Sequence, residues 1–224
     1  MVPSESNRTK KRNGFPAGEH LSGTVYVVDD DVSFRTAIKR HLEKIGYLVI
    51  AYASAEQLLE QRPDENEKGC ILLDVRMPGL NGLALHSRLL ELGSMLPIVF
   101  LTGYVDVTAI VTAIKEGAED FLVKPIKSDE LVGAIERALA RHQAALETKR
   151  QVDALRGRLA KLTPRERQVF VLIVRGRMNK QIAHELGATE RTIKAHRRSV
   201  MEKMKAGSLI ELVSIGERLG ILRR

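Results

Sequence analysis

Five polar side chains in the first part of the chain each stand at the end of a short apolar run. They are Asp29, Asp30, Asp74, Thr102 and Lys124, and the runs are TVYVV, ILL, PIVFL and DFLV. Helical patterns separate these runs, and strands that alternate with helices favour a parallel sheet with crossover helices. Because ligands bind at the carboxyl ends of such strands, three carboxylates, a hydroxyl and an amine are expected to meet there. They suit a site for a divalent metal and a phosphoryl group.

Carboxylates from different strand ends suit Mg²⁺, a hard cation that prefers oxygen ligands and keeps several of its waters. In a doubly wound sheet of order 2-1-3-4-5 the crevice opens between strands 1 and 3, and these strands carry Asp29, Asp30 and Asp74. A carboxylate can also attack phosphorus and form an aspartyl phosphate. The phosphoryl oxygens then need cationic and hydrogen-bonding neighbours, which Lys124 and Thr102 can supply.

The elements that must position these side chains follow from the apolar periodicity. Strands are expected near 24–28, 48–51, 69–73, 97–101 and 120–123. Helices are expected near 32–45, 54–60, 82–92, 106–116 and from about 128 onward. The turn residues between them are Gly46, Pro63, Gly79, Gly93 and Gly117. The first part of the chain is therefore predicted to be an α/β domain with five parallel strands.

Charge is distributed unevenly along the 224 residues. Residues 1–149 contain 18 Lys and Arg and 21 Asp and Glu, a formal charge of −3. Residues 150–224 contain 18 Lys and Arg and 7 Asp and Glu, a formal charge of +11. The basic part favours a polyanionic partner, whereas the acidic part, with its clustered aspartates, favours a cation.

Composition excludes several classes of protein. The single cysteine, Cys70, excludes an intramolecular disulfide and a cysteine-cluster metal site, and it suits a reducing cytoplasm. No apolar stretch approaches the roughly 20 residues of a membrane span, and residues 1–20 lack the apolar core of a secretory signal. We expect residues 1–22 to be a disordered leader. A basic arm that touches DNA is the alternative.

A second unit follows a long helical pattern. This pattern is continuous over 128–161, so the first domain (23–140) is expected to continue into a helical linker over 141–161. The pattern is compatible with a rigid helix or with a break at Gly157. A capping-box start at Thr163, Pro164 and Glu166 then opens a domain over 162–224. Its helices are expected near 165–174, 179–186, 189–204 and 208–219, with stops at Gly187 and Gly207.

One helix of this second unit is strongly basic. The apolar residues expected to face inward are Ile182, Leu186, Ile193, Val200 and Met204. The basic residues expected to project outward are Arg191, Lys194, Arg197 and Arg198. An exposed basic helix that follows a helix and a tight turn is typical of helix-turn-helix proteins, in which the second helix enters the major groove.

The first unit resembles the receiver domain of two-component response regulators. The matching stretches are VVDDD (27–31), LLDVRMPGLNG (72–82), LTGY (101–104) and GAEDFLVKP (117–125), in matching order and spacing. The resemblance covers residues 24 to about 140. It implies a flavodoxin-like (βα)5 fold with strand order 2-1-3-4-5.

The same resemblance implies a role for each strand-end residue. Asp74 would be the phosphoacceptor, and Lys124 would pair with the phosphoryl group. Thr102 would move toward that group, and Phe121 would turn inward as the threonine moves. The ligands of Mg²⁺ would be Asp29, Asp30, Asp74 and the backbone carbonyl of Arg76. Lys124-Pro125 would be a cis peptide, which is a proline speciality.

The second unit resembles the LuxR-type helix-turn-helix over about 162–222. The matching stretches are LTPRERQVF (162–170) and NKQIAHELGATERTIKAHRRSVMEKM (179–204). The DNA-contacting residues that this implies are Lys180, Thr192, Lys194, Ala195, His196, Arg197 and Arg198. Of these, Lys194, Ala195 and Arg198 would face base edges. With the receiver, the module is identified as a member of the FixJ/NarL-type regulators, and TGYVDVTAIVTAIKEGAEDF favours the FixJ side.

The combined interpretation is a phosphorylation-switched transcription regulator rather than a turnover enzyme. A sensor histidine kinase would phosphorylate Asp74, the face around 106–127 would pair two receivers, and the homodimer would bind promoter DNA. RNA polymerase is a further candidate partner. Two alternatives stay open. A metal-dependent phosphatase or phosphotransferase would lack a substrate-binding insertion, and a constitutive DNA-binding protein would leave the complete Asp, Thr and Lys set unexplained.

Overall fold

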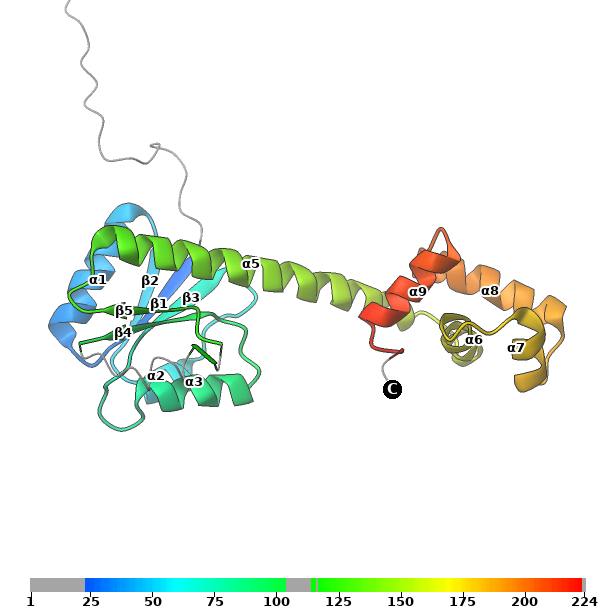
Figure 1. The fold of residues 1–224 in the computed structure, drawn as a ribbon, viewed down its shortest axis with the longest axis horizontal. Helices are drawn as coiled ribbons and strands as arrows, with labels where there is room; N and C mark the ends of the chain where they lie inside the picture. Colours follow the sequence, from blue (N-terminus) through cyan, green and yellow to red (C-terminus); the bar gives the residue numbers. More distant parts are fainter. Residues whose placement is uncertain (1–22, 104–113, 116, 223–224) are drawn as a thin grey trace, which may run out of the picture. The chain divides into compact units, whose positions relative to one another are not determined.

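The computed structural model describes residues 23–103, 114–115 and 117–222 (Figure 1). The chain divides into two compact units between Ala144 and Ala145. Helix α5, Ser128–Leu159, contributes its first turns to one unit and its last turns to the other. The predicted leader and most of the helix predicted over 106–116 lie outside the described residues. Within the described part, no helix is both long enough and apolar enough to cross a membrane.

The first unit is built on five parallel strands in the order β2-β1-β3-β4-β5, as the sequence predicted (Figure 1). The strands are β1 Thr24–Val28, β2 Leu48–Tyr52, β3 Gly69–Asp74, β4 Ile98–Thr102 and β5 Asp120–Val123. Asp74 is paired with Leu101, and Thr102 with Val123. This register brings the carboxyl ends of β3, β4 and β5 together at one edge of the sheet.

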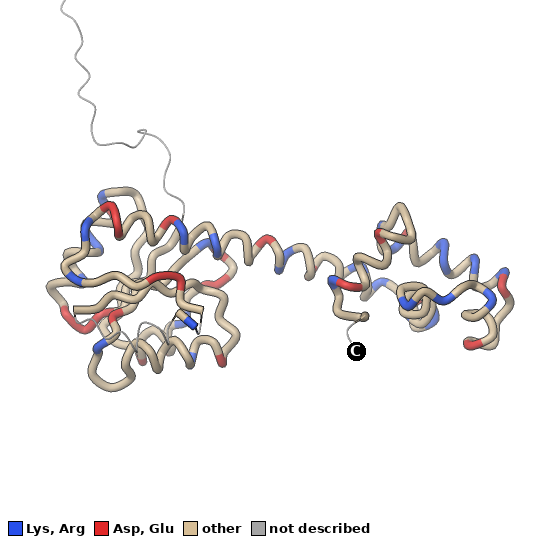
Figure 2. The backbone as a smooth tube through the Cα atoms, viewed as in Figure 1, with Lys and Arg blue, Asp and Glu red and all other residues tan. Residues whose placement is uncertain are grey.

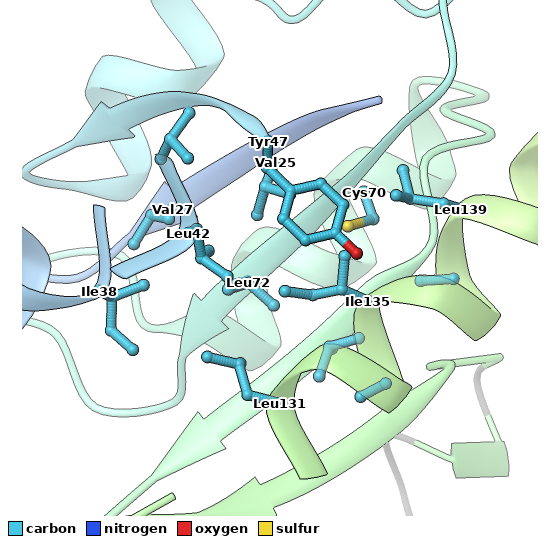
Figure 3. Packing of buried hydrophobic residues seen from close by; sticks show 14 of the residues in the cluster. Val25, Val27, Ile38, Leu42, Tyr47, Cys70, Leu72, Leu131, Ile135 and Leu139 are labelled. Atoms are coloured by element: carbon cyan, nitrogen blue, oxygen red, sulfur yellow. The ribbon is translucent and has the colours of Figure 1, made fainter. Parts of the chain in front are cut away.

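Helices cover both faces of this sheet. Helices α1 (Val32–Ile45) and α5 pack on one face, and α2 (Ala55–Gln61) and α3 (Gly82–Glu91) pack on the other. Figure 3 shows how strand residues on the first face meet residues of the two helices. The labelled residues include Val25, Val27, Leu72, Ile38, Leu42, Leu131, Ile135 and Leu139. These aliphatic layers fix the strand ends in place.

The third aspartate of the DDD run caps helix α1. The Asp31 carboxylate accepts hydrogen bonds from the backbone N–H groups of Ser33 (2.8 Å) and Phe34 (3.2 Å), which the first turn of a helix leaves without partners. The helix ends at Gly46, whose φ of 114° is accessible to glycine. Because of this cap, the first turn of α1 directly follows the carboxyl end of β1.

The second unit contains four short helices besides the end of α5. They are α6 Pro164–Val174, α7 Asn179–Glu185, α8 Glu190–Met204 and α9 Leu209–Arg218. The predicted capping box of Thr163 and Glu166 is confirmed. Gly157 does not interrupt α5. The prediction that Gly207 ends α8 was wrong, because Lys205 takes the left-handed conformation (φ 55°).

The position of this stop is set by packing rather than by the glycine. The N–H of Ala206 donates to the Met201 carbonyl (2.9 Å), and Ala206 is buried. The chain must therefore turn at Lys205, one residue before Ala206, in the manner of a Schellman end.

Candidate functional site

Four of the predicted strand-end residues, Asp29, Asp30, Asp74 and Lys124, border one open hollow of about 330 Å³. Asp29 follows β1, Asp74 and Thr102 close β3 and β4, and Lys124 follows β5. The residues that line the hollow are Asp29, Asp30, Asp31, Asp74, Arg76, Gly103 and Lys124. Asp29, Asp74 and Thr102 are buried, whereas Asp30 is exposed at the rim.

Lys124 joins the two buried carboxylates. Its Nζ atom donates to Asp29 Oδ2 at 2.6 Å and to Asp74 Oδ1 at 2.7 Å. The second oxygen of each carboxylate accepts a backbone N–H, from Asp31 (2.9 Å) and from Arg76 (2.8 Å) respectively. Each carboxylate is therefore held in one orientation by Lys124 on one oxygen and by a backbone N–H on the other.

The surroundings raise the pKa values of both Asp74 and Lys124, but for different reasons. Burial raises the pKa of Asp74, and the negative charge of Asp29 adds to this effect, although Lys124 opposes it. For Lys124, burial lowers the pKa, but the hydrogen bonds to Asp29 and Asp74 outweigh burial, so the pKa is raised. The ammonium is held charged, while the Asp74 carboxylate is ionised at a free-energy cost.

Thr102 ends the strand next to β3, and Phe121 lies on β5 three residues before Lys124. The carbonyl of Thr102 accepts the backbone N–H of Lys124 at 2.7 Å, so the two strand ends are tied together. Phe121 is half-buried, and its ring lies 5.9 Å from the Phe100 ring on the α2 and α3 face. The predicted cis peptide between Lys124 and Pro125 is present.

Sequence reasoning missed two residues of the first turn of α1. The Phe34 ring centre lies 3.9 Å from Lys124 Nζ, and Arg35 Nη1 donates to the Asp29 carbonyl at 2.5 Å. The available signal was Asp31 as a helix cap. A cap placed directly after the strand end puts the next turn beside the pocket.

The donor set fits Mg²⁺. Among the residues that the structure describes, no three His, Cys, Asp or Glu side chains are gathered as a ready-made metal site. However, Mg²⁺ needs only one or two carboxylates because it keeps several waters. Asp29, Asp74 and the exposed Asp30 border the same hollow and offer only hard oxygen ligands.

The basic helix predicted in the second unit is α8, and it follows α7 after a short turn (Figure 2). Its buried residues are Ile193, Val200 and Met204. The predicted DNA-contacting residues that are exposed are Lys180, Thr192, Lys194, Ala195 and Arg198, and those that are half-buried are His196 and Arg197. The Thr192 hydroxyl is already engaged, 2.8 Å from the Thr189 hydroxyl at the helix cap. The exposed basic positions leave the helix free to meet a polyanion.

Glu166 fixes α8 against α6. Its carboxylate accepts from Lys203 Nζ (2.7 and 2.9 Å) and from the Ser199 hydroxyl, both on α8. It also accepts the backbone N–H of Thr163 at 2.8 Å. These bonds, led by that of Lys203, lower the pKa of Glu166 to about 2. Sequence analysis identified the cap but not the link to α8.

Comparisons with known proteins assign a family to each unit. Residues 25–136 match the response regulator receiver domain family, and residues 160–215 match the bacterial regulatory proteins of the luxR family. Nodulation protein W of Bradyrhizobium diazoefficiens is 42% identical over 88% of this chain and 86% of that protein. The transcriptional regulatory protein FixJ of the same species is 40% identical over 89% of this chain and 97% of FixJ.

A solved structure of the response regulator StyR gives a TM-score of 0.75 at 40% identity, covering 88% of this chain and all of that one. Receiver domains in general use Mg²⁺, and a receiver fused to a DNA-binding domain has a sensor kinase and DNA as partners. The chain therefore belongs to the FixJ-type two-component response regulators and is a transcriptional regulator rather than a turnover enzyme.

Proposed function

We propose that Asp74 accepts a phosphoryl group from a sensor histidine kinase. The observation that carries this proposal is the Lys124 ammonium, which bridges Oδ2 of the buried Asp29 (2.6 Å) and Oδ1 of the buried Asp74 (2.7 Å). A buried carboxylate with a raised pKa and a cation held beside it is typical of a reactive site.

In the transfer step, an Asp74 oxygen attacks phosphorus and forms a P–O bond. The bond between phosphorus and the donor nitrogen breaks, and its electron pair leaves with the imidazole. Lys124 then stabilises the charge of the phosphoryl oxygens. Thr102 closes the neighbouring strand and supplies a hydroxyl from the same edge of the sheet.

Mg²⁺ would be held by Asp29, Asp30, Asp74 and the backbone carbonyl of Arg76. When bound, it neutralises part of the negative charge that two carboxylates and a phosphoryl group bring together. Lys124 must give up its present bond to Asp29 if that carboxylate turns to the metal. The remaining contacts of Lys124 would then set the position of its ammonium.

The signal is proposed to travel through Thr102 and Phe121 to the face around 106–127. Two receivers would pair there, and the homodimer would bring two copies of α8 to promoter DNA in the cytoplasm, with RNA polymerase as a further partner. The receiver would span residues 23–140, and the helical linker would span residues 141–161. Lys194, Ala195 and Arg198 would read base edges, and Lys180, Thr192, His196 and Arg197 would hold phosphates.

The acceptor is tested by intact mass after incubation with Mg²⁺ and acetyl phosphate. We expect one added phosphoryl group on the wild-type chain and on the control Asp64→Asn, and none on Asp74→Asn. An adduct that persists in Asp74→Asn contradicts the assignment. Absence of an adduct on every variant, together with no binding of beryllofluoride, favours a constitutive DNA-binding protein.

DNA recognition is tested on the phosphorylated chain. Lys194→Ala should weaken binding to a selected operator by about 1–3 kcal/mol and relax the base preference at one position. Lys149→Ala removes a similar charge from α5 and serves as the control. Operator affinity that is unchanged in Lys194→Ala would contradict the docking of α8.

A further inference from the structure

Phe34 places its ring over the Lys124 ammonium. The distance from Nζ to the ring centre is 3.9 Å, well within the roughly 6 Å over which an aromatic face attracts a cation. Phe34 comes from the first turn of α1, whereas Lys124 follows β5. The contact therefore joins the first turn of α1 to the residue that follows β5.

Two constraints hold Phe34 in this position. Its backbone N–H donates to the Asp31 carboxylate at the helix cap (3.2 Å). Its side chain packs against the core between α1, α5 and the sheet. A ring fixed by a helix cap and a core cluster has little freedom to move away from the ammonium.

Phe34 differs in kind from the other two partners of Lys124. The carboxylates of Asp29 and Asp74 contact the same ammonium, but both change their surroundings when a metal and a phosphoryl group arrive. The ring is neutral, offers no oxygen to a metal and accepts no phosphoryl group. The chemical character of the ring is therefore the same before and after the transfer.

We propose that Phe34 is a positioning residue for phosphoryl transfer. Its ring face keeps the Lys124 ammonium in the pocket while Asp29 and Asp74 turn to the metal and the phosphoryl group. This inference rests on the proposed function and adds to it a residue of α1 that does not itself touch the reacting atoms.

The test is a series of full-length variants that separates ring electrostatics from ring size. Phe34→trifluorophenylalanine keeps the shape of the ring but removes most of the negative potential of its face, Phe34→Leu removes the ring, and Phe34→Tyr keeps it. The rate of phosphorylation by acetyl phosphate is measured at saturating Mg²⁺. We expect the first two variants to be slower by about three- to tenfold and Phe34→Tyr to stay within about twofold of the wild type.

The matched control is Tyr47→Leu, which removes a buried ring from the same core cluster but not from the pocket. It should lower the melting temperature and leave the phosphorylation rate unchanged. A second readout needs neither metal nor phosphate. The ε-methylene protons of Lys124 should show an upfield ring-current shift that Phe34→Leu abolishes.

The outcomes distinguish the two proposals. If the wild-type chain is phosphorylated and Phe34→trifluorophenylalanine reacts at the same rate, the positioning role is refuted and Phe34 is a core residue only. If the wild-type chain takes up no phosphoryl group, the proposed function fails first and the role of Phe34 fails with it. A graded loss in the order Tyr, trifluorophenylalanine and Leu, with the ring-current shift present in the wild type, supports the inference.

Discussion

Each unit of this molecule buries a carboxylate against a lysine, and the two clusters have opposite electrostatic character. In the strand-end cluster (Asp29, Asp74 and Lys124), burial raises the pKa of Asp74. In the helix-cap cluster (Thr163, Glu166, Ser199 and Lys203), hydrogen bonds lower the pKa of Glu166 to about 2. Similar residue types therefore give a carboxylate that resists ionisation in one unit and one that favours it in the other.

The difference lies in the supply of donors. Glu166 accepts from Lys203, from Ser199 and from the Thr163 backbone, so donors surround the carboxylate. Asp74 accepts from Lys124 and the Arg76 backbone, and it shares the lysine with the negative charge of Asp29. Glu166, which holds two helices together, accepts hydrogen bonds from more groups than Asp74, which is proposed to react.

Lys124→Met is expected to have the largest effect on stability. The substitution leaves Asp29 and Asp74 buried together without their cation, which should destabilise the first unit by about 3 kcal/mol at neutral pH. Burial already raises the folded-state pKa of Asp74, and loss of the opposing lysine would raise it further, so the penalty should shrink as the pH falls and Asp74 takes up a proton. Hydrogen exchange of the β1 and β3 amides in urea at pH 7 and pH 5 measures both effects.

Lys127→Met is the control for this substitution, since Lys127 is exposed and lies outside the pocket. A Lys124→Met variant as stable as Lys127→Met at pH 7 would mean that Asp29 and Asp74 do not depend on the ammonium.

Glu166→Gln is expected to have the next largest effect. It removes the charge from several hydrogen bonds that join α6 to α8 and should cost about 2 kcal/mol at neutral pH. The folded-state pKa of Glu166 is depressed, so its contribution is present above the unfolded value of 4.5 and is lost as the pH falls from there toward about 2. Urea unfolding of the second unit at pH 7 and pH 3 measures the difference.

For Glu166→Gln, the exposed residue of the same unit that serves as control is Glu185. Glu185→Gln should be nearly neutral at both pH values. Equal stability of the two variants at pH 7 would remove Glu166 from the comparison.

The sequence predicted the strand-end cluster because strand order alone brings its members together. Asp74 and Thr102 stand at the ends of neighbouring strands, so the topology decides their meeting without knowledge of side-chain conformation. Three of the four basic residues predicted to project outward from α8, Arg191, Lys194 and Arg198, are exposed, because a regular helical period decides their direction, whereas Arg197 is half-buried.

What the sequence could not predict depends on packing between elements. Phe34 reaches Lys124 only because the Asp31 cap aims α1 at the pocket. Glu166 was recognised as a cap, but its bonds to Ser199 and Lys203 depend on how α6 packs on α8. Gly207 was mistaken for a helix stop because the burial of Ala206, which no local pattern shows, sets the turn at Lys205.

The smallest predicted effect has the opposite sign from the other two. Asp74→Asn removes a carboxylate whose pKa is raised by burial and leaves Asp29 to pair with Lys124, so it should modestly stabilise the first unit at pH 7. Because a raised folded-state pKa costs stability only where the unfolded group is ionised, this gain should disappear as the pH falls toward the ordinary value of 3.8. Calorimetry should show a melting temperature higher by at most about 4 °C at pH 7 and a smaller difference near pH 4. Asp64→Asn, on an exposed loop, should change neither. If Asp74→Asn instead lowers the melting temperature at pH 7, Asp74 stabilises the fold as Glu166 does, and the contrast between a reactive and a structural carboxylate does not hold.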